Sequence, residues 1–227
     1  NSAGNISKSV DIPLIADIDT GYGNPINVVR TVNDVIDQGI ACAILEDQEW
    51  PKRCGHLDGK RVISIEEHVE KIRAVRSVSW ESGLVIVART DTRAELGLTD
   101  AIQRGNAYYE AGADVIFIEA PQTEEELGEI PSALPDIPLL ANMIVGGKAP
   151  CLSAQDLEKL GFKLGVFALS GLFAATKGIE DCFRFLKENG TTSGFENISS
   201  FAVYKEVIDI KKCQELEEKF VTRKFPS

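Results

Sequence analysis

The stretch QGIACAILE, residues 38–46, decides the fold, because it contains a helix end, a capping glycine and a buried strand in that order. The same order recurs in AGADVIFIE at 111–119 and in LGFKLGVFA at 160–168. Each strand is a continuous apolar run rather than an alternating one, which indicates burial on both faces. The repeat therefore predicts a parallel sheet that is covered by helices.

Strand-like and helix-like segments alternate along the chain on both sides of these repeats. We expect strands at 12–18, 41–46, 83–90, 113–120, 137–143 and 163–170. Helical periodicity is found at 25–39, 65–79, 98–111, 123–133, 153–161 and 171–189. The short links are compatible with either a (β/α) barrel or a doubly wound sheet. A barrel needs eight strands, so a barrel in this chain would lack its first two βα units.

The bulk composition excludes several classes of protein. A chain of 227 residues, 44% of them hydrophobic, can bury the core of one large α/β domain. A net charge of −11 disfavours nucleic acid and anionic membranes as partners. No apolar run reaches the length of a membrane span, and no signal peptide opens the chain. The chain begins at Asn1 without a methionine, so we expect a processed product or a fragment.

The five cysteines are odd in number and contain no CxxC pair, which favours a reducing compartment over a disulfide framework. We therefore expect a cytoplasmic protein, with an organelle as the alternative.

Polar side chains interrupt the apolar runs at equivalent points, near the end of almost every expected strand. They are Asp17, Asp19, Glu46, Asp47, Arg89, Asp91, Glu119 and Asn142. The carboxyl ends of parallel strands converge on one face, where α/β enzymes have their active sites. Charges on unrelated surface loops would not recur at these points, so we expect the set to form one site.

The segment DIDTGYG, residues 17–23, predicts a metal site. Asp17 and Asp19 are two residues apart at a strand end, and such side chains point the same way. With Glu46 they form an oxygen-only set, which suits Mg²⁺ or, alternatively, Mn²⁺ bound with several waters. An Asx-turn would explain Asp19 alone but not all three acids.

The segment PKRCGHLDGK, residues 51–60, predicts an acid/base group. Lys52, Arg53 and His56 flank Cys54, and each can favour its thiolate over the thiol. Such a thiol can transfer protons near neutral pH. A nucleophile or a buried inert cysteine are the alternatives, and we assign the other cysteines to packing.

Four segments together resemble the isocitrate lyase/phosphoenolpyruvate mutase superfamily. They are ADIDTGYGNPINVVRTV, LEDQEWPKRCGHLDGKRVI, VARTDTRAELGLTDAIQRGNAYYEAGADVIFIEAP and ANMIVGGKAPCLSAQDLEKLGF. Within that superfamily the resemblance is strongest to petal-death-protein-like enzymes and 2,3-dimethylmalate lyases. It implies a TIM-type (β/α)₈ barrel over 1–190, without its first two βα units here. It also implies a helical extension over 191–227 that is exchanged between the chains of a homotetramer.

The resemblance also implies roles for individual residues. Asp17 and Asp19 would bind Mg²⁺, one of them through water, with Glu46 in the same water-bridged network. Cys54 would be the acid/base on a mobile gating loop, and its catalytic neighbours would be Lys52, Arg53 and His56. Arg89 would hold a substrate carboxylate, and the other substrate-binding residues would be Gly55, Glu119, Asn142, Met143 and Ala168.

The implied activity is a Mg²⁺-dependent cleavage of a carbon–carbon bond in a 2-hydroxy dicarboxylate of the alkyl-malate type, which gives a 2-oxo acid and a carboxylate. Three alternatives stay open: an oxaloacetate hydrolase, a catalytically incomplete barrel, and an isomerase like phosphoenolpyruvate mutase. The intact KRCGH motif disfavours the mutase, whose gating loop differs.

Two positions bear on the substrate. Phe173 stands where methylisocitrate lyases carry an arginine for a third carboxylate, so a tricarboxylate is disfavoured. Ala168 stands near the position where oxaloacetate hydrolases place a serine, and it cannot donate that hydrogen bond, although Ser170 lies two residues further on. We expect a small dicarboxylate or oxo-acid substrate.

Overall fold

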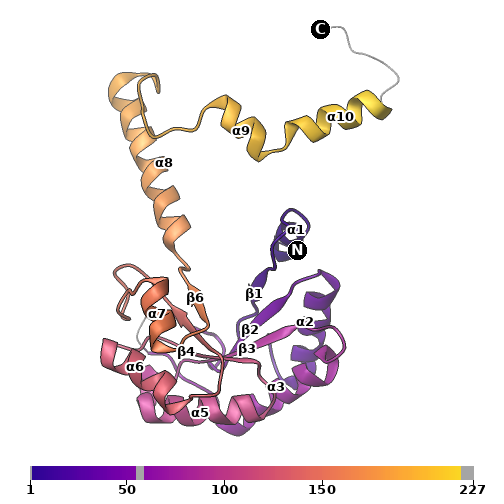
Figure 1. Ribbon diagram of the computed structural model, residues 1–227, viewed down its shortest axis with the longest axis vertical. Coiled ribbons are helices and arrows are strands. Elements are labelled where there is room, and N and C mark those ends of the chain that lie inside the picture. The colour runs from indigo at the N-terminus through magenta and orange to yellow at the C-terminus, as the bar shows by residue number, and fades with distance from the viewer. Residues whose placement is uncertain (1, 55–58, 221–227) are drawn as a thin grey trace. The chain divides into compact units, whose positions relative to one another are not determined.

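The computed structural model of the protein describes residues 2–54 and 59–220, and the chain divides into two compact units. The first unit spans Asn1–Ser170 and the second spans Gly171–Ser227. The first contains the sheet and the second contains the C-terminal helices (Figure 1).

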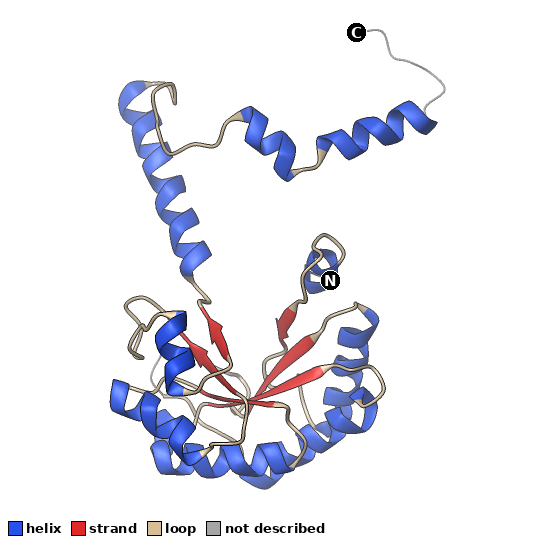
Figure 2. Ribbon diagram, in the orientation of Figure 1, coloured by secondary structure: helices blue, strands red, loops and turns tan. Residues whose placement is uncertain are grey.

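The first unit is built on one parallel sheet whose six strands follow chain order. The strands are β1 (Ile15–Asp17), β2 (Cys42–Glu46), β3 (Val85–Thr90), β4 (Val115–Ile118), β5 (Leu139–Asn142) and β6 (Leu164–Val166). The sheet curls, and its helices lie along one side of it (Figure 2). Within the described residues, β1 and β6 each have a neighbouring strand on one side only. The architecture is an α/β half-barrel, consistent with part of a TIM-type barrel.

The helices of this unit follow the strands in alternation. They are α1 (Ser2–Ser7), α2 (Pro25–Asp37), α3 (Ile65–Ser79), α4 (Arg93–Leu96), α5 (Leu98–Glu110), α6 (Glu124–Ala133) and α7 (Ala154–Leu160). Several start at a side chain that accepts a hydrogen bond from the first turn, as Ser64 does from the Glu67 N–H group. Asn24 and Asn27 form a reciprocal capping box at the start of α2.

The two faces of the sheet bury different sets of side chains. Helix residues such as Val28, Ile72 and Leu127 pack on strand residues of one parity, for example Leu45 and Ile116. Strand residues of the other parity form a second apolar cluster that no helix enters: Cys42, Val87, Val115, Phe117 and Leu140. Because side chains alternate along a strand, Glu46 of β2 and Arg89 of β3 lie on this second face as well. By the same alternation Glu119 follows Phe117, and Asn142 follows Leu140. The sequence pattern thus places these polar groups on one face, at one end of the sheet.

The second unit consists of helices alone. They are α8 (Ser170–Asn189), α9 (Phe201–Val207) and α10 (Ile210–Phe220), and none of them buries a residue. A division by contacts within one chain does not identify a domain, so the boundary expected after residue 190 stays a prediction.

The expected strands and helices are confirmed, with the strands shorter than their apolar runs. Two short helices, α1 and α4, were not expected from the sequence. That the chain lacks the first two βα units of a barrel stays a prediction. None of the described helices is long and apolar enough to cross a membrane.

Candidate active site

Three buried charged side chains meet where β2, β3 and β4 end. Glu46 is fully buried, and its Oε2 atom lies 3.5 Å from Arg89 Nε. On the other side, Arg89 Nη1 lies 3.7 Å from Glu119 Oε2. The Arg89 guanidinium also lies over the Phe117 ring, 5.1 Å from its centroid. The arginine therefore stands between two carboxylates and over an apolar ring.

Asp91 holds this arginine in place. Arg89 Nε donates to Asp91 Oδ2 at 2.8 Å, and Arg89 Nη2 donates to Asp91 Oδ1 at 3.0 Å. Lys60 Nζ lies 3.3 Å from the same Oδ1 atom. Although burial opposes ionisation, Arg89 lowers the pKa of Asp91, and Asp91 raises the pKa of Arg89. Both groups are therefore charged, and the fork geometry fixes the guanidinium plane.

The loop after β1 carries the two predicted metal ligands. The Asp19 N–H group donates to Asp17 Oδ1 at 2.8 Å, so the Asp17 carboxylate lies against the Asp19 backbone. Asp19 and Tyr22 have positive φ angles of 52° and 62°, which are unusual for residues with a side chain. A Cβ atom at Gly21, whose φ is 80°, would lie 2.5 Å from Val28 Cγ2, so only glycine fits the turn.

Lys52 connects this loop with Glu46. Its Nζ atom forms an ion pair with Asp19 and lies 3.6 Å from Glu46 Oε1. Burial alone would lower the pKa of Lys52, but the hydrogen bond to Asp19 and the charges of Glu46 and Asp17 raise it. Cys54 follows two residues later and its side chain is exposed. The structure thus brings the segment of the predicted acid/base to the acids.

The donor set fits a divalent cation that keeps most of its waters. Both Glu46 oxygens are buried and have no hydrogen-bond partner among the residues that the structure describes, and burial raises the pKa of Glu46 to about 7, against the effect of Arg89. A cation near these oxygens would compensate the cost of the buried charge. Within 2–54 and 59–220, no three His, Cys, Asp or Glu side chains are grouped to hold a metal directly. This agrees with Mg²⁺, which binds through one or two carboxylates and retains several waters.

The other predicted site residues are less closely joined. Asn142 ends β5, and its buried Oδ1 atom has no hydrogen-bond partner within the described part of the chain. Met143 packs in the helix-facing core, where its sulfur accepts a hydrogen bond from the Leu152 N–H group at 3.2 Å, so its side chain does not face the acids. Ala168 lies in an exposed turn after β6 and Arg53 is exposed. Gly55 and His56 lie outside the described residues.

The fully buried Asp47 ties two strand ends to α5 behind the site. It accepts hydrogen bonds from Thr90 Oγ1 at 2.7 Å, the Asp91 N–H group at 2.9 Å and Tyr108 OH at 2.8 Å. Arg104 Nη1 also donates to it, at 3.1 Å. Asp47 therefore fixes the turn from which Asp91 reaches Arg89.

Some residues of the site have no signal in the sequence. Lys71 in α3 donates to the Thr20 carbonyl at 3.3 Å, inside the loop of the two aspartates. Lys60 reaches Asp91 from a separate segment. Asp91 itself was expected in the site, because it lies two residues after Arg89 at a strand end. The long-range partners could not be predicted, since no local pattern encodes them.

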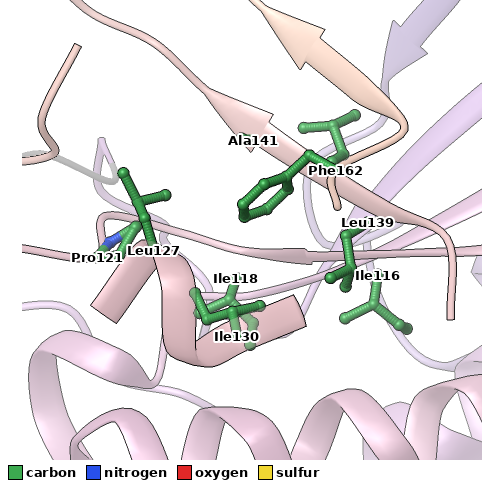
Figure 3. A pocket seen from close by; sticks show the side chains of 9 residues that line it. Ile116, Ile118, Pro121, Leu127, Ile130, Leu139, Ala141 and Phe162 are labelled. Carbon is green, nitrogen blue, oxygen red and sulfur yellow. The ribbon is translucent and has the colours of Figure 1, made fainter. Parts of the chain in front are cut away.

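A pocket between α6 and the sheet is not a candidate active site (Figure 3). It is lined by apolar side chains, among them Ile118, Leu127, Ile130 and Phe162. These residues belong to the helix-facing core, on the opposite side of the sheet from Arg89. With no polar side chain to orient a ligand, the pocket is a packing feature of the core.

Comparison with known proteins identifies the family. The model of the phosphoenolpyruvate phosphomutase family matches residues 1–186. The chain belongs to this family. The predicted superfamily is therefore confirmed.

Relatives with curated descriptions include several lyases. The 2,3-dimethylmalate lyase of Eubacterium barkeri is 40% identical over 96% of this chain and 75% of its own. The petal death protein of Dianthus caryophyllus is 40% identical over 91% of this chain and 65% of its own. The chloroplastic carboxyvinyl-carboxyphosphonate phosphorylmutase of Arabidopsis thaliana is 44% identical over 94% of this chain and 64% of its own. The predicted class, an enzyme of the lyase type in this superfamily, is confirmed.

Solved structures with the same fold include two enzymes bound to small acids. An oxaloacetate acetylhydrolase in complex with 3,3-difluorooxalacetate has a TM-score of 0.91 and 34% identity, covering 98% of this chain and 76% of that one. A phosphonopyruvate hydrolase in complex with oxalate and Mg²⁺ has a TM-score of 0.86 and 28% identity, covering 97% and 77%. This chain therefore spans between about two thirds and three quarters of the length of these relatives.

Proposed function

We propose that the protein is a Mg²⁺-dependent lyase that cleaves a carbon–carbon bond in 2-hydroxy dicarboxylates of the alkyl-malate type. The observation that carries the proposal is the cluster of Glu46, Arg89 and Asp19 at the strand ends, with Lys52 joining the segment of Cys54 to it. Relatives named as lyases support this class of reaction. A phosphonopyruvate hydrolase of the same fold, bound to Mg²⁺ and oxalate, supports the cofactor.

The acidic residues would bind the metal, and the arginine would bind the substrate. Asp17 and Asp19 would hold Mg²⁺, with Glu46 bonded to its waters. Bound there, Mg²⁺ would stabilise the negative charge on the 2-oxygen of the substrate once the hydroxyl proton has been lost. Arg89, fixed by Asp91, would bind a substrate carboxylate.

Cys54 would supply the proton. Once the 2-hydroxyl group of the substrate has lost its proton to solvent, its oxygen forms the carbonyl of the 2-oxo acid as the carbon–carbon bond breaks. The electron pair of that bond stays on the second fragment, as the enolate of a carboxylic acid. The Cys54 thiol would donate its proton to that carbon, because Cys54 is exposed and follows two residues after Lys52, which forms an ion pair with Asp19. Lys52, Arg53 and His56 would favour the thiolate that this step leaves behind.

Two positions bear on the size of the substrate and on the kind of reaction. Phe173 in place of an arginine favours a dicarboxylate over a tricarboxylate. Oxaloacetate hydrolysis is the second candidate function, favoured by the structural similarity to an oxaloacetate acetylhydrolase. Ala168 cannot donate the hydrogen bond that a serine would give there, which is why we place the lyase first.

An activity screen of the full-length protein tests the proposal. It would offer oxaloacetate, 2-methylmalate, 2,3-dimethylmalate, methylisocitrate and phosphonopyruvate with Mg²⁺ and with EDTA. We expect cleavage of an alkyl malate to pyruvate or its homologue in Mg²⁺ and none in EDTA. Turnover of oxaloacetate alone would establish the hydrolase, and turnover of phosphonopyruvate alone the isomerase or its hydrolytic relative. No turnover of any of the five would favour a catalytically incomplete barrel.

We also propose a homotetramer in which the C-terminal helices pack on a neighbouring chain. Large apolar side chains of α8 to α10 are exposed, among them Phe183, Phe201 and Val207. Surface of this kind indicates a protein interface.

A further inference from the structure

The side chain of Gln48 forms two hydrogen bonds with the backbone of Arg53, the residue before Cys54. Gln48 Nε2 donates to the Arg53 carbonyl at 2.9 Å, and Gln48 Oε1 accepts from the Arg53 N–H group at 2.9 Å. Gln48 is almost completely buried, with 1% of its surface exposed. Its amide therefore pairs with both polar groups of one residue, as a neighbouring strand would.

The same glutamine is joined to Arg89 through its neighbour in the chain. Asp47, the residue before it, accepts a hydrogen bond from the Asp91 N–H group at 2.9 Å, and Asp91 holds Arg89 with two hydrogen bonds. The backbone of Gln48 is fixed as well, because Gln48 forms a bridge with Val62 and the Glu49 N–H group donates to the Arg61 carbonyl at 2.8 Å. The position of Gln48 is thus set by the pairing of its backbone segment with residues 61–62, not by the Arg53 segment that its side chain holds.

We propose that Gln48 is a positioning residue that fixes the segment of Cys54 relative to Arg89. This rests on the proposed function, in which Cys54 transfers the proton. Among the described residues no hydrogen bond joins Gln48 to the thiol or to the carboxylates of the metal site, so its effect would pass through the Arg53 backbone.

The physical reason is geometric. A proton donor works only when its atom lies within hydrogen-bond distance of the reacting carbon, and an error of about 1 Å can lower the rate about 100-fold. Cys54 is exposed, so side-chain packing does not fix it. The two hydrogen bonds one residue earlier limit where its backbone can go.

The test compares Gln48→Met with Gln155→Met in the full-length protein. Methionine keeps the length of the side chain but removes both hydrogen bonds, and Gln155 is an exposed glutamine of α7 that serves as the matched control. Nuclear magnetic resonance would follow the hydrogen exchange of the Arg53 amide, which needs no substrate. Steady-state kinetics on the substrate found by the screen would give kcat and KM. Gln48→Asn, whose amide is too short to reach Arg53, is the second variant if the first is unstable.

We expect Gln48→Met to speed exchange at Arg53 about tenfold, through loss of the hydrogen bond that protects it. We expect kcat to fall about 10- to 100-fold, with KM changed less than about threefold because Arg89 keeps Asp91. Gln155→Met should change neither. Unchanged exchange at Arg53, or faster exchange with undiminished kcat, would overturn the proposal. If Cys54→Ala leaves turnover intact, Cys54 does not transfer the proton, and the positioning role of Gln48 fails together with that part of the proposed function. The Gln48 variants alone test only the positioning role.

Discussion

Glu46 is a fully buried carboxylate, and such a group is tolerated only when other charges compensate it. Arg89 and Lys52 lie within 3.6 Å of it, and Asp91 and Glu119 surround the arginine in turn. Each of these charges needs its partners, because removing one of them leaves an uncompensated buried charge on another. The site is therefore a charge network whose members depend on one another.

Asp91→Asn tests this dependence. The substitution removes the charge that faces Arg89 and Lys60, so we expect the free energy of unfolding to fall by about 3–5 kcal/mol. Urea denaturation at neutral pH measures it. Glu126→Gln is the matched control, because Glu126 pairs with Arg93 at a more exposed position, where the loss should be about 1 kcal/mol or less. Equal losses in the two variants would contradict the network.

His68 gives the protein a pH dependence. Burial, with smaller effects from Lys71 and Arg104, lowers the pKa of His68 to about 3, and neither ring nitrogen has a hydrogen-bond partner among the described residues. The unfolded chain takes up this proton near pH 6.5, whereas the folded one does so only near 3. Stability therefore falls as the pH is lowered from 6.5 toward 3, by about 1.4 kcal/mol per pH unit.

Variants at this position isolate that effect. Between pH 7 and pH 5 the free energy of unfolding of the wild type should fall by about 2 kcal/mol more than that of His68→Leu. His68→Gln, which does not titrate either, should behave as His68→Leu does. Chemical denaturation at the two pH values provides the comparison, and parallel pH slopes for all three proteins would refute the assignment.

At this scale the sequence could predict which residue types gather but not all of their partners. Glu46, Arg89 and Glu119 were predicted because polar residues recur at strand ends, and the structure brings them together. The orientation of Met143 was not predicted, since parity along β5 turns its side chain into the helix-facing core. Lys60 and Lys71 come from distant segments, and a single sequence holds no record of such contacts.

Among the elements, α3 supports the loop that carries the acids. Lys71 is buried in that helix, and its bond to the Thr20 carbonyl lies between Asp19 and the sharp turn at Gly21. Burial lowers the pKa of Lys71, so this ammonium is held at some cost. We therefore expect that Lys71 fixes the position of the loop that carries Asp17 and Asp19, and that metal binding depends on it.

Lys71→Met should weaken the binding of Mn²⁺ or Mg²⁺ about three- to tenfold, because the loop loses a charge-assisted hydrogen bond. Isothermal titration calorimetry without substrate measures the affinity. Arg73→Met on the exposed side of the same helix is the control and should leave it unchanged. Equal or tighter binding in Lys71→Met is what loss of a nearby positive charge alone would give, and it would contradict the supporting role.

The element order was predicted more completely than the site was. Helix caps and continuous apolar runs are local signals, and they placed all six strands and the long helices. All six strands are shorter than the apolar runs that predicted them, so the runs located the strands but not their ends. The short helix α1 has no apolar period that could have revealed it.

For the whole molecule, the two units differ in how they are stabilised. The first buries a continuous core, whereas the helices of the second have no buried residue. Helices of this kind gain most of their stability from packing on another surface. A neighbouring chain is the partner that we propose.

Phe201→Glu tests that proposal. We expect light scattering to give the mass of a tetramer for the full-length wild type and a smaller assembly for the variant, since a charge would be buried at the interface. Glu206→Lys, a charge change on the same helix, should leave the assembly intact if Phe201 faces the partner. A wild-type monomer, or a Phe201→Glu tetramer, would contradict the proposal.

The most direct test of the central claim is the turnover of Cys54→Ala on the substrate that the screen identifies. Cys151→Ala is the matched control, because Cys151 is also exposed. If Cys54 donates the proton to the departing carbon, kcat should fall about 10²- to 10⁴-fold in Cys54→Ala, with unchanged thermal stability and metal affinity. Undiminished turnover in Cys54→Ala, or an equal loss in Cys151→Ala, would contradict the account.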